Sequence, residues 1–406
     1  MTQKKRILIL GITMDPAGTE QSFLSFSGRI DYSRYDVTLL LARKSGLFLS
    51  RLPAEIRVEE MAEGGELFTL NRKTAPSAIF RSVLLRHPGK WFSALWYAVR
   101  MAFSPRRRPF LAMRLWRSLE KVLPDRSGSF DAALAFWGDK TMFYMLDHVQ
   151  ADRKIAWLHF DYEHPPREDA LYGPAFAACD RVVTVSEAIA DSLRSRFPEI
   201  RERICVLENR IDPRQIWDLA MSGESFPDPS FRGKRILTIG RIAPQKGLDL
   251  AAEALALLRR KGLEPRWYVI GDGTEEDLTK LRARALDLGV ADLLILLGPS
   301  ANPYPCLRDC DLYVQPSRHE GKPIAVEEAK ILYKTILVTD YLSAAEQTGN
   351  GTLGMIVECS AEALADGIRS LLSDPSLSAR YADRVAETMH PLRFLPPPPL
   401  PEDLLP

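Results

Sequence analysis

The feature that most constrains this chain is an alternation of apolar runs with helix-like segments, which occurs twice along its 406 residues. The first series opens with the apolar run 6–10, which ends at Gly11 and leads through a helix-like stretch at 19–30 into YDVTLLLA at 35–42. A second series of the same kind follows a stretch at 220–233 that is rich in Gly, Ser and Pro and is typical of a linker. Apolar, β-branched runs that alternate with helices predict parallel sheets covered by helices.

Two such units in one chain predict an α/β fold of two Rossmann-like domains that face each other across a cleft. Parallel sheets bind ligands beyond the carboxyl ends of their strands, so the cleft is the expected site. A chain of this length also exceeds what one ordinary hydrophobic core holds. Seven prolines among the last sixteen residues predict an extended or disordered tail. The predicted divisions are an N-terminal domain at 1–215, a linker at 216–233, a C-terminal domain at 234–385 and a tail at 386–406.

The composition is that of a soluble globular protein, with 46% apolar residues, 26% charged residues and a net charge of +1. This near-neutral balance gives the whole molecule no attraction to nucleic acid, so no nucleic-acid partner is expected. The first apolar run is too short for a signal sequence, and no run approaches the roughly 18–20 apolar residues of a membrane span. Five scattered cysteines predict free thiols in a reducing compartment. We therefore expect a cytoplasmic protein.

Two motifs in the second series suit a phosphate ligand. GRIAPQKG at 240–247 places Arg241 and Lys246 on a glycine-bounded loop before a helix, and two cations beside helix N-terminal amides suit a diphosphate. Two solvated cations in a loop are an alternative of equal weight. The turn GDG, with Gly271 and Gly273, follows the next strand and would let the backbone approach a ligand, although such a turn is weak evidence alone.

A third motif, HEGKPIAVEEAK at 319–330, carries two carboxylates eight positions apart. Glu320 lies on the loop after a predicted strand, and Glu328 lies about two turns into a predicted helix, where it would face the cleft. Glu327 would point away from the cleft. The alternative is that these acids are solvated residues in the first turns of a helix, where carboxylates are favoured. The spacing alone leaves both interpretations open.

Taken together, these motifs resemble the C-terminal domain of retaining GT-B glycosyltransferases of the family 4 type, the glycosyl transferases group 1. The shared pattern is Gly-Arg and Lys-Gly on one loop, Gly-x-Gly after the next strand, and two Glu eight positions apart after Pro-Ser. In this chain the pattern is carried by Gly240, Arg241, Lys246, Gly247, Gly271, Gly273, Pro316, Ser317, Glu320 and Glu328. Segments 17–42, 179–193 and 206–212 resemble parts of the N-terminal domain, so the resemblance spans about residues 5–375.

By this resemblance, Arg241 and Lys246 would bind the donor diphosphate and offset the charge of the leaving nucleotide. Glu328 would bind the ribose hydroxyls, and Glu320 would contact the donor sugar near the reacting carbon. No metal or other cofactor is expected, because the two cations and helix amides would replace the magnesium that other transferases use. Further donor contacts are implied for Gly11, Gly18, Gly271, Gly273 and the backbone amides of Gly321 and Lys322.

His159, at the end of KIAWLH, lies where the family places a histidine that faces the donor sugar. It would complete the catalytic set with Glu320, Arg241 and Lys246. The alternative is a histidine that only packs at the end of a strand. One departure from the family pattern is the Pro-rich tail, which does not resemble the helix that normally crosses back to the first domain.

The implied activity is that of a retaining, hexosyltransferase-like enzyme that moves a sugar from a nucleotide-sugar donor, with UDP expected, to an acceptor hydroxyl. The expected acceptor is a lipid-linked intermediate of a cell-surface polysaccharide. A nucleotide-sugar epimerase of the same fold is one alternative, and a non-catalytic module that binds nucleotides or glycans is another. The intact set of Arg, Lys and two Glu argues against the silent module.

Residues 81–119 form a segment with nine basic residues and no acid, interleaved with Trp and Phe. Such a segment predicts contact with an anionic membrane surface, to which each nearby cation contributes ~1 kcal/mol. The protein would then lie on the inner face of the cell membrane, which argues mildly against the epimerase. The alternative is a solvated helical face with aromatics in the core. The basic residues are Arg81, Arg86, Lys90, Arg100, Arg106, Arg107, Arg108, Arg114 and Arg117.

Overall fold

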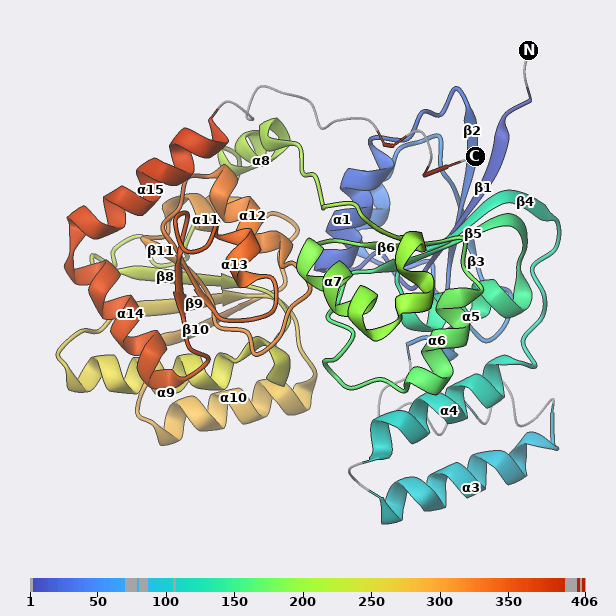
Figure 1. Ribbon diagram of the computed structural model, residues 1–406. Helices are drawn as coiled ribbons and strands as arrows, with labels where there is room; N and C mark the ends of the chain where they lie inside the picture. Colours follow the sequence, from blue (N-terminus) through green and yellow to red (C-terminus); the bar gives the residue numbers. More distant parts are fainter. Residues whose placement is uncertain are drawn as a thin grey trace.

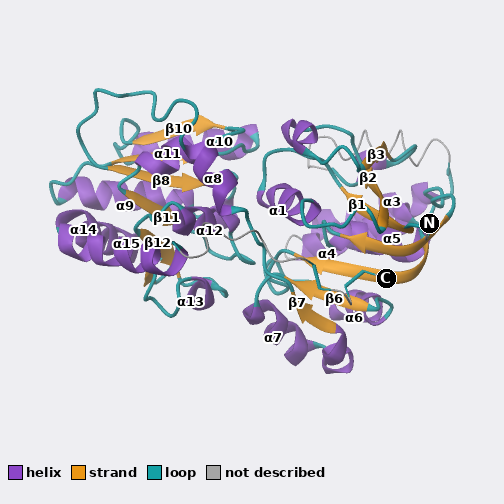
Figure 2. Cartoon of the chain, turned by 90° about the horizontal axis from the view of Figure 1, so that it is seen from above, coloured by secondary structure: helices purple, strands orange, loops and turns teal. Residues whose placement is uncertain are grey.

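Two parallel α/β domains lie side by side in the computed structural model, as Figures 1 and 2 show. The structure describes residues 3–69, 79, 87–104, 107–390, 400–401 and 404–405. Each domain has its own hydrophobic core, and the predicted class of two Rossmann-like domains is confirmed.

The N-terminal domain is built on seven described strands in the order β3-β2-β1-β4-β5-β6-β7, all parallel. The interior strand β1 is buried along most of its length because helices cover both faces of the sheet, which explains its continuous apolar run. The strands are β1 (Lys5–Gly11), β2 (Tyr35–Leu41), β3 (Arg57–Glu60), β4 (Ser129–Ala135), β5 (Gln150–Leu158), β6 (Arg181–Thr184) and β7 (Ile204–Val206). The helices are α1 (Gly18–Ser27), α3 (Lys90–Phe103), α4 (Arg108–Glu120), α5 (Asp139–His148), α6 (Asp169–Ala177) and α7 (Glu187–Arg196).

The C-terminal domain has six described strands in the order β10-β9-β8-β11-β12-β13, also parallel. The strands are β8 (Arg235–Ile239), β9 (Arg266–Ile270), β10 (Leu294–Gly298), β11 (Leu312–Gln315), β12 (Ile336–Thr339) and β13 (Met355–Val357). The helices are α8 (Pro213–Ala220), α9 (Leu248–Arg260), α10 (Glu275–Asp287), α11 (Tyr304–Asp309), α12 (Ile324–Ile331), α13 (Ala344–Gln347), α14 (Ala361–Ser373) and α15 (Pro375–Met389). Across the cleft, α12 of this domain contacts α1 of the first.

The chain crosses between the domains earlier than the composition predicts. Helix α8 packs on α11 and α12, and Ile211, Ile216 and Phe226 belong to the C-terminal core. The crossing therefore precedes Ile211 rather than falling at 216–233. The stretch at 220–233 has the composition of a linker because it is an irregular surface loop of the second domain.

The end of the chain returns to the N-terminal domain, as Figure 1 shows. Leu404 and Leu405 are 5% and 4% exposed and pack into the core of that domain. The sequence did not predict this return, since the tail does not resemble a crossing helix. The prediction of an extended or disordered tail falls mainly on residues 391–399, which lie outside the described residues.

Helices α3 and α4 form a pair that projects from the N-terminal domain (Figure 1). Helix α4 is anchored by Leu115, Trp116 and Leu119, which are buried, whereas α3 has no buried residue. Among the described residues, no helix combines the length and apolar character needed to cross a bilayer.

Candidate active site

A cleft of about 500 Å³ lies between the two domains, beyond the carboxyl ends of strands from both sheets. Its size is in the range typical of small-molecule sites. Its lining includes six residues of the predicted set: Gly18, His159, Arg241, Lys246, Glu320 and Glu328. Gly271, Gly321 and Lys322 also line it. Nine of the eleven predicted residues therefore lie at one cleft, although most of the lining residues were not predicted.

At the centre of the cleft, Lys246 and Glu320 form an ion pair with 2.6 Å between Nζ and Oε1. Ser317 Oγ and Gln315 Nε2 donate to the same oxygen at 2.6 and 3.2 Å. Glu320 is only 6% exposed, so these three donors stabilise a carboxylate that burial would otherwise penalise. The arrangement fixes the direction of the carboxyl group.

Gly247 allows this ion pair to form. Its φ is +65°, and a Cβ there would lie 1.9 Å from the carbonyl oxygen of Pro316. A side chain would therefore push the loop after β8 away from the loop after β11. The close approach of these two backbones explains why glycine follows lysine in this motif.

Arg241 provides a second cation on the same loop. It is exposed to the cleft and makes no ion pair within 4 Å among the residues that the structure describes. The guanidinium interacts with Glu20 at longer range, and without an ion pair in the described part of the chain its donors stay available to a phosphate.

The two glycines of GDG have a packing role that the sequence did not predict. A Cβ at Gly271 would lie 2.0 Å from the carbonyl oxygen of Gly240, and one at Gly273 would lie 2.7 Å from that of Ile242. Both glycines therefore let the loops after β8 and β9 pack together. Gly271 also lines the cleft, whereas Gly273 is absent from its described lining.

Glu328 lies at another wall of the cleft, on α12. It is 3% exposed, and its Oε1 accepts a hydrogen bond of 2.8 Å from Tyr304 Oη. Burial raises the pKa of Glu328 to about 7, and the bond from Tyr304 offsets only part of this effect. A carboxyl with one free oxygen at a cleft wall suits the binding of two neighbouring hydroxyls.

His159 follows β5 and lines the cleft from the N-terminal domain. Its ring centroid lies 4.7 Å from that of Phe136 and 6.1 Å from that of Trp157. Burial lowers the pKa of His159 to about 3, so the ring is neutral at physiological pH. Its Nε2 is buried and has no hydrogen-bond partner in the described part of the chain. The ring thus both packs and presents an unpaired nitrogen.

The two glycines predicted in the first domain differ in position. Gly18 begins α1 and lines the cleft, where a Cβ would meet only Ile324 of the other domain at 3.7 Å. Gly11 is absent from the described lining. A Cβ at Gly11 would lie 2.8 Å from Leu41 and 3.0 Å from Trp137, so this glycine makes room for packing behind the cleft.

Three charged residues that line the cleft were not predicted from the sequence, namely Glu20, Arg51 and Asp272. Glu20, on α1, is 7% exposed and accepts a hydrogen bond of 2.9 Å from Trp137 Nε1. Burial raises the pKa of Glu20 to about 7. Arg51 lies over the ring of Phe48 and has a buried, unpaired Nη2. The position of Glu20 in the first turn after Gly18 was a usable signal, whereas nothing near Arg51 in the sequence marked it.

Two facing parallel-sheet domains with a polar cleft between them define the GT-B fold. Residues 227–388, which lie almost entirely in the C-terminal domain, match the model of the family described as glycosyl transferases group 1.

Similar curated proteins are named as transferases. The chain is 30% identical to an alpha-D-kanosaminyltransferase of Streptomyces kanamyceticus over 155 residues, which cover 37% of this chain and 39% of that protein. It is 25% identical to the N-acetylgalactosamine-N,N'-diacetylbacillosaminyl-diphospho-undecaprenol 4-alpha-N-acetylgalactosaminyltransferase of Campylobacter jejuni, over 52% of this chain and 55% of that protein. The matched part thus spans about half of these relatives or less.

Solved structures share the whole fold. HepE of Anabaena, in complex with UDP and glucose, superimposes with a TM-score of 0.66 at 16% identity, and the match covers 95% of each chain. TarM of Staphylococcus aureus gives a TM-score of 0.64 at 13% identity, over 95% of this chain and 96% of that one. Identities this low establish the fold alone.

Proposed function

We propose that this protein is a retaining glycosyltransferase that moves a sugar from a nucleotide-sugar donor, with UDP as the nucleotide, to an acceptor hydroxyl. The observation that carries the proposal is the convergence of Arg241, Lys246, Glu320 and Glu328 in one cleft between the domains. The family match concerns transferases, which favours transfer over epimerisation or silent binding.

In this proposal the donor diphosphate lies against Arg241 and Lys246. Their positive charges offset the charge that develops on the leaving nucleotide, which is where preorganised electrostatic stabilisation has its largest effect. Glu328 accepts hydrogen bonds from the ribose hydroxyls. Glu320, held by its three donors, contacts the sugar near the reacting carbon. Neutral His159 accepts a hydrogen bond from the sugar at Nε2. The lack of a partner for this nitrogen among the described residues supports the predicted place of His159 in the catalytic set.

The names of similar proteins support the finer parts of this proposal. HepE of Anabaena is described in complex with UDP and glucose, which supports UDP as the donor nucleotide. The Campylobacter jejuni relative is named for an acceptor carried on diphospho-undecaprenol. We therefore propose a lipid-linked glycan intermediate as the acceptor.

Thermal unfolding with a panel of nucleotide sugars tests the donor assignment. A ligand present at about 100–1,000 times its Kd stabilises a protein by about 2.7–4.1 kcal/mol. We expect one or more UDP-sugars to raise the unfolding temperature, and ADP- or GDP-sugars to raise it less. Equal shifts with all nucleotides, or none with any, would contradict the assignment.

The same panel tests the ionisation of Glu328. At pH 8 this carboxyl is ionised, and at pH 6 it is largely protonated, because burial raises its pKa to about 7. Ligand stabilisation is therefore expected to be larger at pH 8, since a carboxylate is the stronger acceptor for hydroxyl groups. Glu20 titrates in the same range, so Glu328→Gln and Glu20→Gln separate the two contributions. A pH-independent shift in the wild type contradicts this role.

We further propose that α3 binds an anionic membrane surface. Its large apolar side chains are exposed, with Phe92 and Phe103 at 83% and 85%, and no acid occurs in 81–119. Arg100 lies over the ring of Trp96, with 4.6 Å from Cζ to the centroid. Trp116 instead lies in the core, as the alternative interpretation of this segment expected. Arg81, Arg86 and Arg106 lie outside the described residues.

Co-sedimentation with phosphatidylglycerol vesicles at low salt tests the membrane proposal. We expect the wild type to bind, and Phe92→Ser/Phe103→Ser to bind at least about tenfold less, because each buried Phe contributes about 1.5–3 kcal/mol. Leu286→Ser is the matched control, since Leu286 is 71% exposed on α10 in the other domain. A wild type that stays in the supernatant, or a double variant that binds normally, rules the surface out.

A further inference from the structure

The segment 319–322 contacts the N-terminal domain at three of its four residues. The ring of His319 stacks on that of His164, with 5.5 Å between centroids and 28° between planes. A Cβ at Gly321 would lie 2.1 Å from the carbonyl oxygen of His159, so the two backbones touch. Glu320, between them, is the residue that pairs with Lys246 inside the cleft. One short segment therefore belongs both to the donor site and to the contact between domains.

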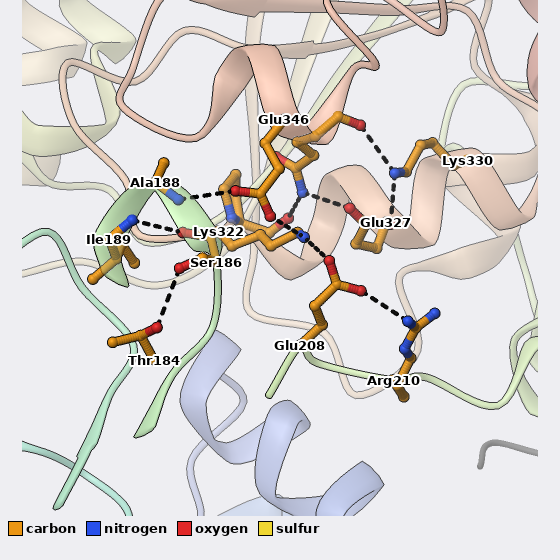
Figure 3. Close-up of polar contacts among 12 residues, drawn as sticks. Thr184, Ser186, Ala188, Ile189, Glu208, Arg210, Lys322, Glu327, Lys330 and Glu346 are labelled. Carbon is orange, nitrogen blue, oxygen red and sulfur yellow. Dashed lines mark hydrogen bonds and ion pairs between the residues drawn. The ribbon is translucent and has the colours of Figure 1, made fainter. Parts of the chain in front are cut away.

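The third contact is made by the side chain of Lys322, which Figure 3 shows between two carboxylates. Its Nζ lies 2.7 Å from Glu208 Oε1 in the segment after β7 and 2.9 Å from Glu346 Oε1 on α13. Glu208 precedes the crossing to the C-terminal domain, and Glu346 follows it. The ammonium group thus joins an acid of one domain to an acid of the other.

Both acids are themselves held in place (Figure 3). The Oε2 atom of Glu346 accepts a hydrogen bond of 3.1 Å from the backbone N–H of Ala188, in the first turn of α7. A carboxylate at a helix N-terminus is favoured by the unpaired N–H groups there. Glu208 Oε2 lies 3.0 Å from Arg210 Nη2. The network therefore runs from α7 of the first domain to Glu346 on α13 of the second, and from there through Lys322 back to Glu208 of the first.

The burial of Lys322 makes this contact sensitive to the loss of a partner. Its side chain is 8% exposed, and burial by itself lowers the pKa of Lys322. Glu327, Glu208 and Glu346 outweigh this effect, so the pKa lies above its ordinary value. A buried charge that loses its partner is destabilised far more than an exposed one. Separation of the domains would expose Lys322 and break the bond to Glu208.

We propose that Lys322 is a positioning residue, whose bridge between Glu208 and Glu346 keeps the two domains closed and thereby holds Glu320 at the donor site. This role differs from the donor contact through the backbone amide of Lys322 that the family resemblance implies. The closure itself does not depend on the proposed function, and only the effect on UDP affinity rests on it.

Small-angle X-ray scattering and titration calorimetry with UDP on the full chain test this proposal. Lys322→Met removes the charge at similar length, and Glu208→Gln removes the partner in the first domain, at a residue that does not line the described cleft. Lys322→Arg keeps the charge. Glu187→Gln is the matched control, because Glu187 is an acid of α7 with 61% side-chain exposure, and its ion pair in the described structure is with Arg194 of the same helix.

We expect a larger radius of gyration and about a tenfold higher Kd for UDP in Lys322→Met and Glu208→Gln, a size typical of coupling between a conformational change and a site. Lys322→Arg should recover most of both values, and Glu187→Gln should match the wild type. An unchanged radius of gyration in Glu208→Gln, with its fold confirmed by thermal unfolding, overturns the proposal. Failure of UDP to bind the wild type would contradict the proposed function, while the scattering result would still decide the closure.

Discussion

Glu320→Gln is expected to lower the rate of sugar transfer by about 10²–10³-fold, with a much smaller change in UDP affinity. Glu320 accepts hydrogen bonds from Lys246, Ser317 and Gln315 at a single oxygen, so its second oxygen is aimed by the protein rather than by the ligand. A glutamine keeps the shape but removes the negative charge from the position proposed to lie beside the reacting carbon. The contacts proposed between the nucleotide and Arg241 and Glu328 are not changed by this substitution.

Glu327→Gln is the matched control for this variant. Glu327 belongs to the same motif but pairs with Lys330, with 2.7 Å between Oε2 and Nζ, and is absent from the described lining of the cleft. Its replacement leaves the Lys246–Glu320 pair intact, so the loss of rate should be far smaller than in Glu320→Gln and limited to the weaker support that Lys322 then receives. Steady-state kinetics with the UDP-sugar selected by thermal unfolding provide the measurement. A wild-type rate in Glu320→Gln would remove Glu320 from the catalytic set.

The parts of the candidate site that depend on local sequence patterns could be predicted. Strand β8 is an apolar run that ends in Gly240, and the cations of the following loop lie at fixed positions before α9. Parallel strands end at the same edge of a sheet, so the loops after β8 and β11 had to meet. Their meeting places Lys246 against Glu320, which are 74 residues apart.

Contacts that depend on the relative position of the domains could not be predicted. Lys322 pairs with Glu208, 114 residues away, and no spacing in the sequence relates the two. Segment 81–119 shows the same limit, because its pattern does not reveal that Trp116 is buried while Phe92 is exposed. The GDG motif predicted that Gly273 lies beside a ligand. In the structure Gly273 makes room for the backbone of Ile242. In each case the deciding neighbour lies on another element.

The double variant Arg241→Ala/Lys246→Ala is expected to lose UDP affinity by at least about 100-fold. Each hydrogen bond to a charged group contributes roughly 1.5–3 kcal/mol, and both cations face the proposed diphosphate position. Loss of Lys246 also leaves Glu320 buried with only two neutral donors, which adds an unfavourable charge beside the phosphate. Lys280→Ala/Arg282→Ala removes the same charge from the exposed face of α10 and is the control.

Titration calorimetry of UDP into the wild type, this double variant and its control tests the central claim most directly. The account predicts that the wild type and the control bind UDP with the same Kd. It predicts that the double variant binds at least about 100-fold more weakly while it is still folded at the temperature of the titration, as thermal unfolding can check. UDP binding of equal strength in the wild type and the double variant would contradict the assignment of this cleft as a nucleotide-sugar site.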